Sequence, residues 1–168
     1  LILARVGARL WIARIMISWG VISSAFVFTG SIPWGPVSAG LGLTDEQLSF
    51  YALRFLLGAA EAGFFPGVIL YLTYWFPAQR RAQMVALFMT AIAVSNIIGS
   101  PVSGAILQFM DGASGMHGWQ WLFMLEGIPS VVMGLVILAF LADHPRTAKW
   151  LEPDERELVL ARIAAEEA

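Results

Sequence analysis

Residues 82–110 contain no charged side chain, and this run limits the possible folds of the chain more than any other feature. Because an α-helix rises about 1.5 Å per residue, about 20 apolar residues are enough to cross a hydrocarbon layer of about 30 Å. A helix also satisfies its own backbone hydrogen bonds where no water is present. The run therefore predicts a helix that spans a membrane.

The composition of the whole chain agrees with a membrane protein. Hydrophobic residues make up 58% of the sequence, charged residues 13%, and the mean hydropathy is +0.73. These values lie outside the range of an ordinary soluble domain. We predict an all-α integral membrane fold with four transmembrane helices, at residues 10–28, 50–76, 83–109 and 119–141. The predicted loops are 29–49, 77–82 and 110–118, and polar segments at 1–9 and 142–168 flank the spans.

The basic residues outside these spans follow a strict pattern. They occur in segments 1–9, 77–82 and 142–168, whereas loops 29–49 and 110–118 contain no lysine or arginine. They are Arg5, Arg9, Arg80, Arg81, Arg146, Lys149, Arg156 and Arg162. By the positive-inside rule the basic segments are cytoplasmic, so both ends of this multi-pass chain are expected in the cytoplasm and loops 29–49 and 110–118 in the periplasm.

Several functional classes are disfavoured. The absence of cysteine excludes disulfides, thiolate metal sites and cysteine nucleophiles. A net charge of −2 gives no reason to expect a nucleic-acid partner. The sequence offers no set of serine, histidine and acid, and no cluster of metal ligands, at a shared depth, so we expect neither an enzyme nor a bound metal or cofactor. The chain starts at Leu1 and ends in a polar segment, and we expect it to be a fragment of a longer protein.

Two charges interrupt the second span. Arg54 and Glu61 are seven residues apart, close to two helical turns, so they face nearly the same way at a rise of about 10.5 Å. A direct bridge between them is not assured at that rise. A charge at the bilayer centre costs on the order of 2.5–3.5 kcal/mol, and such residues usually serve a function. Glu61, near the midplane, could load and release a proton, and Arg54 could bind a carboxylate. The alternative is a structural pair, with Arg54 reaching to the interface.

Other polar and small residues in the spans are candidates for coupling or packing. Glu126 and Asn96 are possible coupling or structural residues, and an inter-helix hydrogen bond is the favoured explanation for Glu126. Small residues at every fourth position of the third span predict a close approach of a neighbouring helix, and prolines predict kinks. The residues predicted for packing or hinge motion are Gly58, Gly63, Pro66, Gly67, Gly99 and Pro101.

Three segments together resemble one known family. These are RFLLGAAEAGFFPG at 54–67, YLTYWFP at 71–77 and GWQWLFMLEGIP at 118–129. They are similar to the anion:cation symporter family of the major facilitator superfamily, and most of all to bacterial permeases for tartrate, phthalate and related organic acids. Arg5, Gly7 and Arg9 match the family's basic loop, whereas Ala4 stands where an aspartate is common. Loop 29–49 is longer than the family's pattern suggests.

The resemblance implies a location in the fold and a function. The four spans would be helices three to six of a twelve-helix fold in the bacterial inner membrane, so the remaining helices would be partners. Glu61 would be the proton-coupling acid and Arg54 the arginine at the substrate site. We expect symport of a small organic anion with protons by alternating access, in which protonation of Glu61 frees Arg54 to bind the anion. The alternative is a membrane scaffold that transports nothing and whose charges only fix helix packing.

Overall fold

The structure is a computed structural model that describes residues 6–167, and all regular structure within that range is helical. The helices are α2 (Ala8–Ala25), α3 (Pro36–Gly40), α4 (Asp45–Glu61), α5 (Phe64–Trp75), α6 (Ala78–Phe109), α7 (Gly118–Phe140) and α8 (Pro153–Glu167), with the short 3-10 helices η1 (Phe26–Ser31), η2 (Ala113–Gly115) and η3 (Pro145–Thr147). Ala4 and Arg5 lie outside the described residues.

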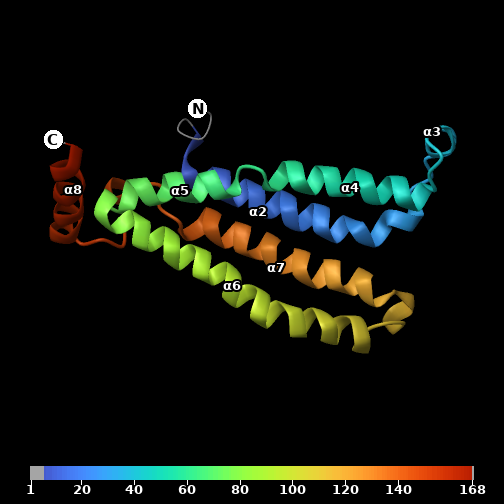
Figure 1. The fold of residues 1–168 in the computed structure, drawn as a ribbon. Coiled ribbons are helices and arrows are strands. Elements are labelled where there is room, and N and C mark those ends of the chain that lie inside the picture. The colour runs from blue at the N-terminus through green and yellow to red at the C-terminus, as the bar shows by residue number, and fades with distance from the viewer. Residues whose placement is uncertain (1–5, 168) are drawn as a thin grey trace.

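Four segments are long and apolar enough to cross a membrane. They are Ala8–Ser31, Asp45–Trp75, Ala78–Phe109 and Gly118–Phe140. The prediction of an all-α membrane fold with four spans is therefore confirmed. Figure 1 shows these segments side by side, with α4 and α5 following one another in a line and α8 lying across one end of the bundle.

The ends of two predicted loops differ in the structure. Loop 29–49 ends at Thr44, because Thr44 caps α4: its hydroxyl accepts from the main-chain nitrogen of Gln47, whose side chain accepts from the main-chain nitrogen of Thr44. Loop 77–82 is almost absent. Phe76 is extended, as expected before a proline, and the helix resumes at Ala78.

The second span is broken within its length. Its two halves are separate helices, with Ala62 and Gly63 between them. Gly63, Pro66 and Gly67 are among the residues predicted for packing or hinge motion, and the interruption comes at Gly63, three residues before Pro66. The position of the break has a steric reason, because a proline ring in a helix clashes with the carbonyl four residues earlier, here that of Ala62. By contrast, α6 runs through Pro101 without interruption.

The closest helix contact joins α2 and α7. A Cβ atom built on Gly20 would lie 2.5 Å from the carbonyl oxygen of Gly127, and one built on Gly134 would lie 2.6 Å from the side chain of Ile17. Only glycine permits this approach of two backbones. The contact makes α2 and α7 the central pair of the bundle, while α4 and α5 pack on α2 and α6 packs on α7 and α5.

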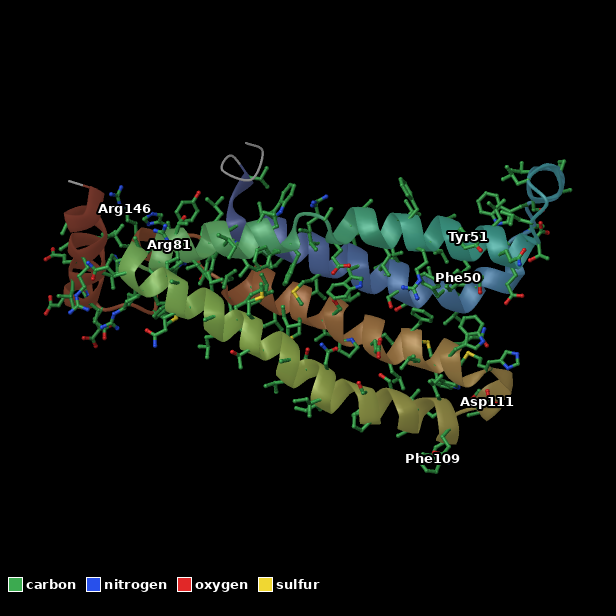
Figure 2. All side chains as sticks on the ribbon, viewed as in Figure 1. Phe50, Tyr51, Arg81, Phe109, Asp111 and Arg146 are labelled. Atoms are coloured by element: carbon green, nitrogen blue, oxygen red, sulfur yellow. The ribbon has the colours of Figure 1, made fainter. Side chains whose placement is uncertain are left out.

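One end of the bundle carries the basic residues. Figure 2 labels Arg81 and Arg146 at the end near α8, and Asp111 at the opposite end. At the basic end, Asp143 Oδ1 accepts a hydrogen bond of 2.7 Å from the main-chain nitrogen of Arg9. Trp75 and Trp150 stack there with ring centroids 5.5 Å apart. These contacts attach the segment after α7 to the ends of α2 and α5.

Candidate functional site

Glu61 is the last residue of α4 and lies directly at the helix break. It lines a cavity of 380 Å³ between α2, the α4–α5 break and α6. The lining residues are Trp19, Glu61, Ala62, Phe64, Phe65, Phe88, Ile92 and Ser95. Most of this lining is apolar, so the Glu61 carboxylate is the charged group of the cavity. Its position, 16 residues from the start and 14 from the end of the Asp45–Trp75 segment, is close to the middle of the span.

Glu126 lines a second cavity, of 350 Å³, between α2 and α7. Its Oε1 atom accepts a hydrogen bond of 3.0 Å from the hydroxyl of Ser103, which links α7 to α6. Trp19 lines both this cavity and the Glu61 cavity. The two intramembrane acids are therefore found on cavities that share one tryptophan.

Arg54 lies over a cluster of three aromatic rings. Its Cζ atom is 5.2 Å from the ring centroid of Phe50, 5.6 Å from that of Phe26 and 5.8 Å from that of Phe123. Each distance falls within the range of a cation–π interaction. Phe26 is fully buried and stacks on Phe123 at 4.4 Å between centroids. The aromatic cluster holds the guanidinium while leaving the Arg54 side chain exposed.

Arg54 and Glu61 do not pair. Within the described part of the chain the one close pair of opposite titratable side chains is His117 with Asp111, at 3.9 Å. The structure therefore brings Glu61 to the cavity at the break and Arg54 to the aromatic cluster, as two separate positions on α4. No group of three or more potential metal ligands occurs among the described residues.

Trp11 holds the helix break in place. Its indole Nε1 donates a hydrogen bond of 3.0 Å to the carbonyl oxygen of Gly63. A Cβ atom on Gly63 would lie 2.7 Å from the Trp11 ring, and one on Gly67 would lie 3.0 Å from it. Arg14 in turn lies over the same ring, with its Cζ 4.4 Å from the centroid. Gly63 at the break and Gly67 in the first turn of α5 thus leave the space that the Trp11 indole fills.

The other predicted packing residues have open surroundings. Built Cβ atoms on Gly58 and Gly99 would meet nothing within 4 Å among the described residues. Asn96 donates to the carbonyl of Ile92 one turn earlier, at 3.1 Å, so its amide bonds to its own helix. Two serines of α6 do have partners: Ser95 lines the Glu61 cavity, and the hydroxyl of Ser103 donates a hydrogen bond to Glu126.

Sequence reasoning missed the aromatic residues of the site. Trp11, Trp19, Phe26 and Phe123 sit in apolar runs, where an aromatic side chain is also expected to face lipid. A partial signal existed for Trp11 and Trp19, because two tryptophans eight residues apart lie on similar faces of one helix. Only the packing of α2 against α4, α5 and α7 shows what that face contacts.

The fold and these two acids within apolar spans define a polytopic helical membrane protein with a cavity at a broken helix. The model of the Major Facilitator Superfamily matches residues 1–165, and the chain belongs to that family.

Several curated proteins are similar over all or nearly all of the chain. A protein of Agrobacterium vitis named "Putative tartrate transporter" is 51% identical over 100% of the chain and 35% of its own length. A Pseudomonas putida protein named "Putative metabolite transport protein NicT" is 49% identical with the same coverage. The Escherichia coli "Inner membrane transport protein RhmT" is 36% identical over 99% of the chain and 35% of its own length. The chain thus spans about a third of the length of these relatives.

Proposed function

We propose that this chain is part of a secondary transporter that carries a small organic anion together with protons. The observation that carries the proposal is the position of Glu61, a carboxylate on a cavity at a helix break near the middle of a span. Substrate and ion sites of secondary transporters lie near the midplane, where discontinuous helices meet. The names of the relatives support a small organic substrate, and the tartrate name supports a carboxylate.

In this proposal Glu61 is the group that takes up and releases the proton. The Glu61 carboxylate is the charged group that lines this cavity, so in this proposal it exchanges its proton when the cavity opens to water. The cavity is bounded by α4 and α5, which meet at the break, and by Phe88, Ile92 and Ser95 of α6. These three helices could move relative to α2. Protonation of Glu61 would then decide which of two arrangements of α4, α5 and α6 is populated.

Arg54 is proposed to bind the anion at a level different from that of Glu61. Three aromatic rings keep the guanidinium in place without a carboxylate partner among the described residues, so a substrate carboxylate can bind it without displacing Glu61. The proton on Glu61 and the anion on Arg54 would therefore be coupled through the electrostatic field and the packing of α4. Glu61 and the substrate do not need to compete for direct contact with Arg54. We place the basic end of the bundle on the cytoplasmic side of a bacterial inner membrane, because basic residues are enriched on that side.

Reconstitution of the full-length protein in vesicles tests the proposal. Tartrate uptake driven by an inward proton gradient is compared with tartrate counterflow without a gradient. We expect Glu61→Gln to abolish accumulation but to retain counterflow, because a permanently neutral side chain mimics the protonated state. Glu46→Gln, at the other end of α4, is the control and should behave as wild type. Uptake by Glu61→Gln at the wild-type level under the gradient would show that Glu61 is not the coupling group.

The same experiment addresses the scaffold alternative. A scaffold predicts no flux of tartrate or of other small carboxylates in either assay, even for the wild-type protein. It also predicts that isosteric changes at Arg54 and Glu61 affect only stability. Flux in counterflow alone, insensitive to the proton gradient, would instead identify a uniporter or an exchanger.

A further inference from the structure

A third cavity lies at the basic end of the bundle, away from Glu61 and Arg54. It has a volume of 630 Å³ and is formed by the beginning of α2, the end of α7 and the segment around η3. Its polar lining includes Arg9, Asp143, Thr147 and Lys149, while the end of α7 supplies apolar residues such as Phe140. This cavity has no part in the proposed transport reaction.

The cavity has an excess of unpaired positive charge. The single carboxylate, Asp143, is engaged by the main-chain nitrogen of Arg9 and not by its guanidinium. Neither Arg9 nor Lys149 forms an ion pair within the described residues. The Nε atom of Arg9 is buried and has no hydrogen-bond partner there. A buried donor without an acceptor is costly, and an anionic oxygen is the acceptor that a guanidinium binds best.

Two exposed aromatic residues line the same cavity as these two cations. Phe140, the last residue of α7, is 78% exposed, and Trp150 is 65% exposed. An exposed phenylalanine at the end of a span offers a contact for an acyl chain, and tryptophan prefers the level of the lipid headgroups. A single ligand that presents phosphate to Arg9 and Lys149 and hydrocarbon to Phe140 would satisfy both parts of the cavity.

We propose that this cavity binds the phosphate group of an anionic phospholipid, with Arg9 and Lys149 as the phosphate ligands. Basic pockets between the ends of transmembrane helices are suited to such headgroups. Phosphate chemistry alone would also suit a soluble phosphate, but the exposed apolar wall at the end of α7 favours the lipid. The proposal is independent of the roles assigned to Glu61 and Arg54.

Native mass spectrometry of the full-length protein tests this assignment. The protein is incubated with equal amounts of phosphatidylglycerol and phosphatidylcholine, and bound lipids are counted. We expect the wild type to retain phosphatidylglycerol preferentially. The double variant Arg9→Gln/Lys149→Gln should lose roughly tenfold in that preference, since each basic residue near a membrane surface attracts anionic lipid. Arg9→Gln retains the main-chain bond to Asp143, so the local fold is expected to persist.

Arg146→Gln is the matched control, because Arg146 lies at the same end but does not line the cavity. It should keep the wild-type preference. An equal loss in the double variant and the control would reduce the effect to general surface charge and overturn the site. A wild type without preference for phosphatidylglycerol would overturn it as well. Stabilisation against thermal unfolding by inorganic phosphate, with no such lipid preference, would replace the lipid by a soluble anion and refute the proposal.

Discussion

The indole nitrogen of Trp11 donates a hydrogen bond to the carbonyl oxygen of Gly63, 52 residues away, at a distance of 3.0 Å. This single contact joins α2 to the point where the second span changes from α4 to α5. The carbonyl oxygen of Gly63 also accepts a hydrogen bond of 3.1 Å from the main-chain nitrogen of Gly67, so the indole is its second donor, placed where α5 begins. An indole supplied by a neighbouring helix therefore stabilises the break that positions Glu61.

Replacing Trp11 by phenylalanine removes this donor and keeps an aromatic ring. We expect a loss of about 1 kcal/mol in the free energy of unfolding, the usual net value of one hydrogen bond. Circular dichroism during thermal unfolding measures it. Trp34→Phe is a suitable control, since Trp34 donates a bond of 2.7 Å to the hydroxyl of Ser49, near the start of α4 and far from the break. Both variants should lose stability, but only Trp11→Phe should alter transport rates. Unchanged transport in both would argue against a role of this bond in the site.

A methyl group added at the break should be much more harmful than one added elsewhere on α4. The Cβ of Gly63→Ala would lie 2.7 Å from the Trp11 ring, and overpacking of this kind costs roughly 1–3 kcal/mol. Gly58→Ala meets nothing within 4 Å among the described residues and gains helix propensity. We expect Gly63→Ala to lower the unfolding temperature and Gly58→Ala to leave it unchanged or raise it. A lower unfolding temperature for Gly58→Ala than for Gly63→Ala would contradict the close packing of the Trp11 ring on Gly63.

Arg54 should not be replaceable by lysine. A guanidinium stacks on aromatic rings and can bind a carboxylate with two parallel hydrogen bonds, whereas an ammonium is a compact point charge. We expect Arg54→Lys to weaken tartrate binding about tenfold, because it loses the planar contact with both partners. Equilibrium binding of tartrate to the purified full-length protein measures this. Arg80→Lys, at the basic end, should bind as wild type. Equal affinity of Arg54→Lys and wild type would exclude a stacked, bidentate arginine.

Ser103 and Glu126 provide a test of the link between α6 and α7. Ser103→Ala removes the hydroxyl that donates to Glu126, at an expected cost of about 1 kcal/mol of stability. Glu126→Gln keeps an oxygen that can accept this bond, so it should lower stability less than Ser103→Ala does. If Glu126 also takes part in coupling, Glu126→Gln will reduce proton-driven accumulation while Ser103→Ala will not. Stability from chemical unfolding and accumulation in vesicles distinguish the structural from the coupling role.

His144 predicts a pH dependence of stability at the basic end. Burial, and then the neighbouring charge of Arg146, lower the pKa of His144 below its ordinary value of 6.5. As pH falls below 6.5, the unfolded chain takes up this proton before the folded one, so the stability contributed by neutral His144 is lost. The neutral Nδ1 also accepts a bond from the main-chain nitrogen of Arg146. We expect unfolding temperatures of wild type and His144→Asn to differ less at pH 5 than at pH 7.5. A constant difference would contradict the shift.

The spans and Glu61 could be predicted from the sequence, because long apolar segments and a charge within one of them are local properties. The exact break could not, since Pro66 acts on a carbonyl four residues earlier and Gly63 accommodates the Trp11 ring. The neighbours of small residues were also unpredictable. Gly99 on α6 resembles Gly127 on α7 as a packing residue, yet only the latter meets another backbone among the described residues. The aromatic support of Arg54 depends on residues from three separate elements.

The glycine contact between α2 and α7 has a consequence for measurements of motion. Gly20 and Gly127 bring two backbones so near that neither helix can rotate or slide without a collision. These helices therefore provide a fixed reference frame inside the protein. The distance between spin labels on α2 and α7 should be the same with and without substrate. Displacements of α4, α5 or α6 can then be measured relative to these two helices.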